Sequence, residues 1–150
     1  MGLRTLVIGV GNLLRCDDGA GVHVVNRLRE MAPHIDAEDV AMGSIEVLEA
    51  MRGYDRVIVV DSVKTGAEPG MVFRVNITRG DEPPAMGSSH GVDLVTTLRL
   101  GASLFPDEMP REQIIIGIEA GDITTLSEEC TPPVEAAIRR VVEDIISAAS

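Results

Sequence analysis

A run of four β-branched residues, Val57-Ile58-Val59-Val60, forms the centre of the segment Arg56–Val63. A strand with one face in water alternates apolar and polar side chains, and this run shows no such alternation. β-branched side chains pack well in strands, and a strand that is apolar on both sides is covered on both faces. The run therefore predicts a central, parallel strand between two layers of helices, with Asp61 ending its apolar part.

The rest of the chain predicts strands that alternate with helices. Further strands are expected at Leu3–Val10, Val40–Met42, Met71–Val75 and Gln113–Ile118. Helices are expected from Asp17 or Asp18 to just before Pro33, from Ser44 to Met51, from Val92 to Leu100 and from Pro132 onward. The strand at Met71–Val75 follows the strand at Arg56–Val63 after too few residues for a crossover helix, so we expect it to pair antiparallel at an edge. Residues 79–91 have no periodicity and contain two adjacent prolines, which predicts a loop.

Together these elements predict a single α/β domain over residues 1–150. The expected architecture has three layers: a doubly wound, mostly parallel sheet of about five strands, helices on both of its faces, and one antiparallel edge strand. Aromatic residues make up only 2% of the chain, so the core must be aliphatic. The apolar stripes of the first and last helices are predicted to face it: Val22, Val24, Val25, Leu28 and Met31 in the first, and Val134, Ile138, Val141 and Ile145 in the last.

The charge balance argues against a nucleic-acid partner. The chain carries 13 Lys and Arg against 24 Asp and Glu, a formal charge of −11, which repels phosphate backbones. Its two cysteines, Cys16 and Cys130, form no C-x-x-C pair and suit a reducing compartment. No signal-peptide pattern and no apolar run of membrane-spanning length is present in the sequence. We therefore expect a cytoplasmic protein that does not enter a membrane.

Three places in the sequence fall at the carboxyl ends of the predicted strands, where folds of this class bind ligands. They are the segment with Asp17 and Asp18, the position of Asp61, and the loop with His90. Carboxylates beside a glycine turn are ready ligands for a cation, and a loop histidine can present an imidazole nitrogen to a metal. Each residue taken singly also has an ordinary structural role, such as a helix cap or a loop contact.

Other chemistries fit the motifs less well. Gly9-Val10-Gly11 after a strand suggests a dinucleotide site, but Leu14 occupies the position of the third small residue, and the two aspartates would repel a pyrophosphate. The stretch Gly87–Gly91 matches the serine-hydrolase pattern G-x-S-x-G with Ser89 as nucleophile, yet no strand precedes it and no histidine follows His90. Cys16 could join a soft metal site or act as a redox thiol, although a lone thiol is usually a small packing side chain.

The stretch Gly9-Val10-Gly11-Asn12-Leu13-Leu14-Arg15-Cys16-Asp17-Asp18-Gly19-Ala20-Gly21-Val22 resembles the N-terminal signature of the hydrogenase maturation endopeptidases. These proteases trim the C-terminal extension from the large subunit of nickel–iron hydrogenases after nickel insertion. The resemblance continues through later segments of the chain: Val57–Val63, Pro69-Gly70, Ser89-His90-Gly91, Ile116–Glu119 and Thr131–Val134.

This resemblance implies a specific site and partner. By position in the motifs, Asp18, Asp61 and His90 correspond to the family's nickel-binding and catalytic residues. The resemblance also implies that the nickel belongs to the precursor, so that a monomeric enzyme holds no metal at rest and acts on a nickel-loaded hydrogenase large subunit. The alternatives are a nickel-binding carrier or chaperone without proteolysis, and a nucleotide-binding α/β protein. On this interpretation alanine at Asp61 or His90 abolishes trimming, whereas Asp17 serves as a helix cap worth about 1 kcal/mol.

Overall fold

A computed structural model of the chain describes residues 3–40, 45–81 and 89–149, and of residues 89–93 only the backbone. Five strands form one sheet in the order β2-β1-β3-β5-β4. Their bounds are β1 Thr5–Val10, β2 Asp36–Val40, β3 Arg56–Val63, β4 Val72–Asn76 and β5 Glu112–Glu119. All neighbours are parallel except β4, which runs antiparallel to β5 at the edge, as the sequence predicted.

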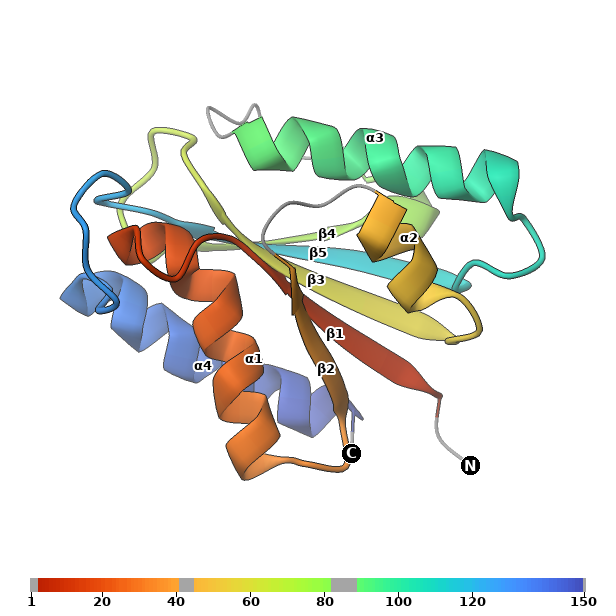
Figure 1. Cartoon of the computed structure of the whole chain (residues 1–150), viewed down its shortest axis with the longest axis horizontal. Helices are drawn as coiled ribbons and strands as arrows, with labels where there is room; N and C mark the ends of the chain where they lie inside the picture. The colour runs from red at the N-terminus through yellow and green to blue at the C-terminus, as the bar shows by residue number, and fades with distance from the viewer. Residues whose placement is uncertain (1–2, 41–44, 82–88, 150) are drawn as a thin grey trace.

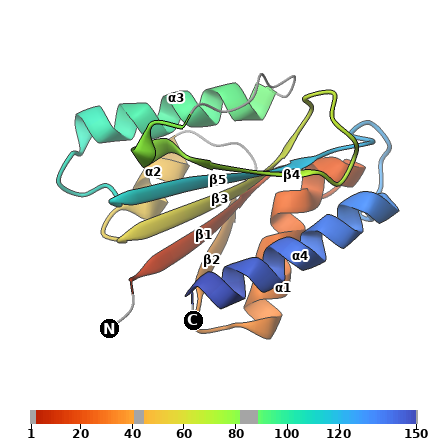
Figure 2. The ribbon, with the colours of Figure 1, turned by 180° about the vertical axis from the view of Figure 1, so that it is seen from behind.

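Helices cover both faces of this sheet, so the predicted three-layer architecture is confirmed. They are α1 Ala20–Met31, α2 Ile45–Met51, α3 Ser89–Leu104 and α4 Pro132–Ala149, with short 3-10 turns η1 Cys16–Gly19 and η2 Ile77–Arg79. The ribbon shows α2 and α3 on one face and α1 and α4 on the other (Figure 1). The view from behind shows β4 at the near edge of the sheet, above α4 (Figure 2). No helix in the described part of the chain has the length and apolarity needed to cross a membrane.

The central run of β3 divides its side chains between two aliphatic cores. Ile58 and Val60 pack with α1 and α4, whereas Val57 and Val59 pack with α2 and α3. All four side chains are buried, which explains why the run shows no alternation. The face predicted for the last helix is confirmed, since Val134, Ile138, Val141 and Ile145 are all buried.

Two predicted elements are displaced in the structure. The second strand is Asp36–Val40 rather than Val40–Met42, and residues 41–44, with the predicted cap Ser44, lie outside the described residues. Strand β2 pairs only with β1 and is partly exposed, so its polar sequence gives no apolar signal. Helix α3 begins at Ser89, within the predicted loop, and extends to Leu104.

For one residue of the first helix, Met31, the prediction that it faces the core is wrong. Val22, Val24, Val25 and Leu28 are buried as expected, but Met31 is 61% exposed. Met31 is the last residue of α1, where the helix passes beyond the edge of the core. The helical period alone therefore extended the stripe one turn too far.

Candidate functional site at the carboxyl ends of the strands

The turn after β1 packs directly on the sheet, and two glycines make this possible. Gly11 has a φ of 144°, and a Cβ atom there would lie 2.1 Å from the carbonyl oxygen of Asp18. A Cβ atom on Gly21 would lie 2.2 Å from the carbonyl oxygen of Val60 in β3. Any larger residue would push η1 and the start of α1 away from the strands. The glycine pattern of the motif thus brings Asp18 up to the end of β3.

Asp61 is a buried acid whose carboxyl oxygens lack hydrogen-bond partners among the described residues. Its side chain is 1% exposed, and neither carboxylate oxygen has a hydrogen-bond partner among the described residues. Burial raises the pKa of Asp61 to about 8, the backbone amide of Ser62 opposes this rise, and the carboxylate of Asp18 adds to it. Strand β3 has the bounds predicted for it, Arg56–Val63, and Asp61 lies within it, directly after the apolar run.

Asp18 lies beside Asp61, and these two predicted site residues are therefore brought together. Its side chain is buried, and one carboxylate oxygen accepts a hydrogen bond from the backbone amide of Asn12 at 2.9 Å. The other oxygen accepts from the hydroxyl of Ser62 at 3.3 Å. Ser62 had no role in the sequence interpretation, although its place directly after Asp61 puts it at the same strand end. Asp18 is thus oriented by groups from both β3 and the turn after β1.

The third predicted residue, His90, is the second residue of α3. Its side chain lies outside the described residues. The helix itself packs on the sheet face of Val57 and Val59, because Leu94, one turn later, is buried in the same aliphatic core. Strand side chains alternate between faces, so Asp61 belongs to this face too. Within the described part of the chain, no three His, Cys, Asp or Glu side chains are grouped so that they could hold a metal ion.

Asp17 does not cap the first helix, and the corresponding prediction is wrong. Neither η1 nor α1 receives a side-chain cap, and Asp17 is completely buried. Its carboxylate accepts hydrogen bonds from the amides of Gly121 at 2.8 Å, Asp122 at 3.0 Å and Thr131 at 2.7 Å, and from the Thr131 hydroxyl at 2.8 Å. The side chain reaches away from its own helix because these distant donors lie in the loop before α4. Asp17 therefore joins η1 to the segment that begins α4.

A second buried acid, Glu119, holds the loop between β3 and β4. It is 1% exposed and accepts hydrogen bonds from the backbone amide of Thr65, at 3.0 and 3.1 Å to its two oxygens, and from the Thr65 hydroxyl. The sequence interpretation gave this residue no role. The sequence did contain an indication of this role. Glu119 directly follows the apolar strand predicted at Gln113–Ile118, and a carboxylate buried there would need hydrogen-bond donors.

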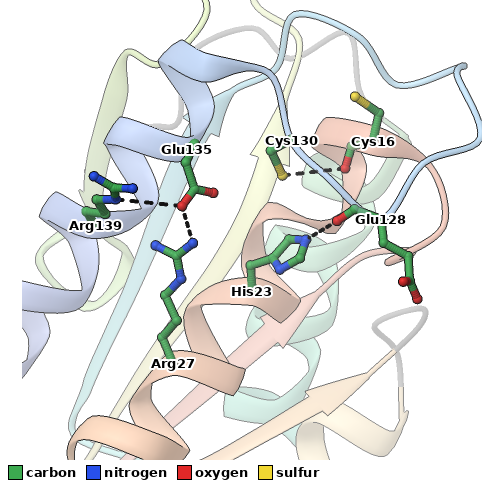
Figure 3. A network of polar contacts seen from close by, with 7 residues as sticks. All are labelled: Cys16, His23, Arg27, Glu128, Cys130, Glu135 and Arg139. Atoms are coloured by element: carbon green, nitrogen blue, oxygen red, sulfur yellow. Dashed lines mark hydrogen bonds and ion pairs between the residues drawn. The ribbon is translucent and has the colours of Figure 1, made fainter.

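The two cysteines lie near each other behind the site but are both free thiols. Cys130 Sγ donates to the carbonyl of Cys16 at 3.6 Å, beside the contact of His23 with the carbonyl of Glu128 (Figure 3). Burial raises the pKa of Cys16, and it raises that of Cys130 to about 12. Thiols of this kind are poorly reactive near neutral pH, which gives no support to a redox or soft-metal role. Nearby, Glu135 pairs with Arg27 and Arg139 and links α4 to α1 (Figure 3).

The geometry suits a divalent cation better than an acid–base pair alone. Asp18 and Asp61 are buried acids that lie close enough for the charge of Asp18 to help raise the pKa of Asp61, and the oxygens of Asp61 have no donor in the described structure. A cation between them would lower the pKa of Asp61 again, favour the ionised form of both acids and occupy the oxygen lone pairs. Carboxylate oxygens together with an imidazole form a mixed ligand set that borderline divalent metals accept.

Comparison with known proteins gives consistent results over nearly the whole chain. A family model described as hydrogenase maturation protease matches residues 22–148. The hydrogenase 2 maturation protease of Escherichia coli (strain K12) is 29% identical over 154 residues, which cover 97% of this chain and 90% of that protein. The hydrogenase expression/formation protein HupD of Rhizobium leguminosarum bv. viciae is 27% identical, over 95% of this chain and 72% of that protein.

A solved structure supports the same conclusion for the fold. The [NiFe] hydrogenase maturation protease HybD from Thermococcus kodakarensis superposes with a TM-score of 0.81 at 25% sequence identity. The match covers 99% of this chain and 100% of that one. The five-stranded mixed sheet and its helices are thus shared along the full length.

Proposed function

Because the chain belongs to the hydrogenase maturation protease family, we propose that it is an endopeptidase that removes the C-terminal extension of a nickel–iron hydrogenase large-subunit precursor. The precursor is cut after nickel has been inserted, and its nickel is what the enzyme recognises. The partner is therefore a nickel-loaded precursor, and the protease carries no metal of its own at rest. We take the protein to act as a monomer in the cytoplasm, a compartment that suits its two free thiols.

The observation that carries this proposal is the state of Asp61. A carboxylate that is 1% exposed, has no hydrogen-bond partner in the described structure and lies beside a second carboxylate is costly to keep. Such costs are retained where a ligand compensates for them. The substrate's nickel would do so, because a divalent cation favours the ionised form of both acids.

In this mechanism Asp18, Asp61 and His90 bind the nickel that the precursor brings. A bound divalent metal can polarise a peptide carbonyl or lower the pKa of a water molecule, and either effect assists hydrolysis. The chain's own groups set the geometry: the Asn12 amide and the Ser62 hydroxyl orient the carboxylate of Asp18. Burial of Asp61 keeps bulk water from its oxygens, which strengthens their attraction to a cation.

The test is to incubate the purified protein with nickel-loaded and nickel-free precursor and to weigh the products by mass spectrometry. We expect the loaded precursor alone to lose its C-terminal extension. Loss of a residue that merely supports a metal ligand lowers activity by roughly 10–100-fold. Because Asp61 is proposed to bind the nickel itself, Asp61→Asn should lower the cleavage rate by more than this. Asp55→Asn is the matched control, because Asp55 comes directly before the opposite end of β3 and its carboxylate accepts one described hydrogen bond, from the amide of Arg4.

Three results would each contradict a part of the proposal. Equal cleavage of both precursor forms would exclude recognition through nickel. Binding of the loaded precursor without cleavage would instead favour a carrier or chaperone. Full activity of Asp61→Asn would remove Asp61 from the site.

A further inference from the structure

Two leucines stand out at the carboxyl edge of the sheet because they are exposed in loops. Leu14, in the turn between β1 and η1, is 57% exposed, and Leu126, in the loop between β5 and α4, is 84% exposed. Single exposed leucines are common on protein surfaces. These two, however, come from segments far apart in the sequence that lie side by side, where the blue loop meets the red turn (Figures 1 and 2).

Backbone hydrogen bonds fix this neighbourhood. Arg15 and Ser127 form an isolated parallel bridge. The amide of Ser127 donates to the carbonyl of Leu14 at 2.9 Å, and the amide of Cys16 donates to the carbonyl of Ser127 at 2.8 Å. The leucines are therefore carried on paired backbone and not on independent loops, and presenting them to a partner costs little ordering entropy.

The loop on the Leu126 side is also ordered by its own contacts. The carboxylate of Asp122 accepts from the amides of Thr124 and Thr125 at 2.9 and 3.0 Å and from both threonine hydroxyls. These bonds hold the carboxylate of Asp122 in its ionised form and lower its pKa. The acid is thus used within the loop, which leaves Leu126 at its tip.

The two segments that carry the leucines contain one charged residue, and acids flank the second segment. Residues 12–16 and 123–127 contain only Arg15 among charged residues, whereas Asp122, Glu128 and Glu129 directly adjoin residues 123–127. Apolar contact at the centre with polar and charged residues around it is the usual arrangement of a protein–protein interface. We call the surface made by residues 12–16 and 123–127 the leucine rim.

The leucine rim adjoins the proposed site directly. The amide of Asn12 donates to the carboxylate of Asp18 at 2.9 Å, and the amide of Asp18 donates to the carbonyl of Arg15 at 3.0 Å. A folded protein that brings a metal ion to the carboxylate of Asp18 must therefore cover the rim as well. This continuity identifies the occupant as the protein that carries the nickel.

We propose that Leu14 and Leu126 form a docking surface for the polypeptide that surrounds the nickel of the precursor. This inference rests on the proposed function and adds a role for residues that do not touch the metal. The leucines contribute affinity for the folded substrate, whereas the chemistry stays with the acids of the site. Their loss should consequently raise KM for the precursor and leave kcat and the binding of nickel ions unchanged.

The test uses the double variant Leu14→Gln/Leu126→Gln. Its matched control is Leu100→Gln/Leu104→Gln, because these leucines are 49% and 58% exposed but lie in the second half of α3, toward the opposite edge of the sheet. For the rim variant we expect a KM for nickel-loaded precursor at least about tenfold higher, which corresponds to about 1.4 kcal/mol of lost binding. The control should keep the wild-type KM. Calorimetry with nickel ions alone and thermal unfolding should give wild-type values for both.

The inference fails if the rim variant keeps the wild-type KM, or if the control variant shows the same rise. Direct binding of nickel-loaded precursor to immobilised protease separates this outcome from failure of the proposed function. A wild-type protein that binds but does not cleave contradicts the protease, while weakened binding by the rim variant still supports the docking surface. Single variants at Leu14 and Leu126 replace the double variant if it unfolds.

Discussion

Asp17 and Asp61 occupy the same edge of the sheet and are equally hidden from water, but their surroundings are opposite. Asp17 accepts hydrogen bonds from three backbone amides and one hydroxyl. Asp61 accepts none from the described residues and has the carboxylate of Asp18 as a neighbour. One acid thus stabilises the fold, while the other is held in a state that destabilises it. Residue type and burial do not distinguish these two acids, but the number of hydrogen-bond donors around each carboxyl group does.

The largest expected effect comes from removing the satisfied acid. Asp17→Ala should lower the free energy of unfolding by at least about 3 kcal/mol, because three backbone amides lose their acceptor and each unmet buried donor costs about 1–3 kcal/mol. Urea unfolding measures this directly. A loss near 1 kcal/mol would instead agree with the helix-cap role expected from the sequence and would weaken the contrast between the two acids.

The second effect concerns pH and the unsatisfied acid in chelator-treated protein. The folded-state pKa of Asp61 is raised to about 8 from 3.8, so its stabilising contribution is complete below about pH 4 and is lost as the pH rises toward 8. Asp61→Asn removes this loss. Between pH 5.5 and 7.5 the variant should therefore gain about 2 kcal/mol relative to wild type, given a slope of at most about 1.4 kcal/mol per pH unit.

The measurement is urea unfolding of both proteins at several pH values with a chelator present. Asp55→Asn serves again as control, since this exposed acid at the other end of β3 should leave the wild-type slope unchanged. Parallel curves for wild type and Asp61→Asn would mean that Asp61 finds donors in solution.

Nickel ions alone should stabilise the protein through Asp61 and not through the structural acid Glu119. Binding to the folded state raises the free energy of unfolding by about 1.4 kcal/mol when free nickel is ten times its dissociation constant. We expect this gain in wild type and its loss in Asp61→Asn. The gain should persist in Glu119→Gln, whose acid serves the loop between β3 and β4. Thermal unfolding with and without nickel measures it, and an equal gain in Asp61→Asn would exclude Asp61 as a ligand.

The smallest effect is expected at Glu119, a structural acid with fewer partners. Glu119→Gln keeps one oxygen acceptor for the Thr65 amide and should lower the free energy of unfolding by about 1 kcal/mol or less. Hydrogen exchange of the Thr65 amide should accelerate, while exchange in the β3 core stays slow. Unchanged exchange at Thr65 would show that other contacts hold this loop.

The fold was predictable where local pattern and burial agree. The unalternated run in β3 and the apolar stripe of α4 each determine which faces are covered, and both predictions are confirmed. Strand β2 was predicted a few residues too late, at Val40–Met42, because its pairing with β1, and not its own polar residues, makes it a strand. The predicted bounds of β3 are also confirmed, and Asp61 lies within the strand because pairing with β5 continues through Val63.

The site was predictable only in part, for a related reason. The motif around Asp18 is contiguous in sequence, so its glycines and acids can be recognised together. The donors to Asp17 lie more than 100 residues away, in Gly121, Asp122 and Thr131, and nothing in a single sequence identifies which loop amides converge on one carboxylate. That no described residue donates a hydrogen bond to Asp61 is likewise a tertiary property.

The link between Asp17 and Thr131 has a consequence for biosynthesis. The two residues are separated by 114 positions. In a nascent chain leaving the ribosome, the carboxylate of Asp17 therefore emerges long before the amide and hydroxyl of Thr131 that donate to it. The full set of hydrogen bonds to Asp17 can form only after the start of α4 has emerged from the exit tunnel. An unfinished polypeptide therefore lacks part of the bonding that fixes the turn bearing Asp17 and Asp18, and this anchorage is completed late, with the final helix.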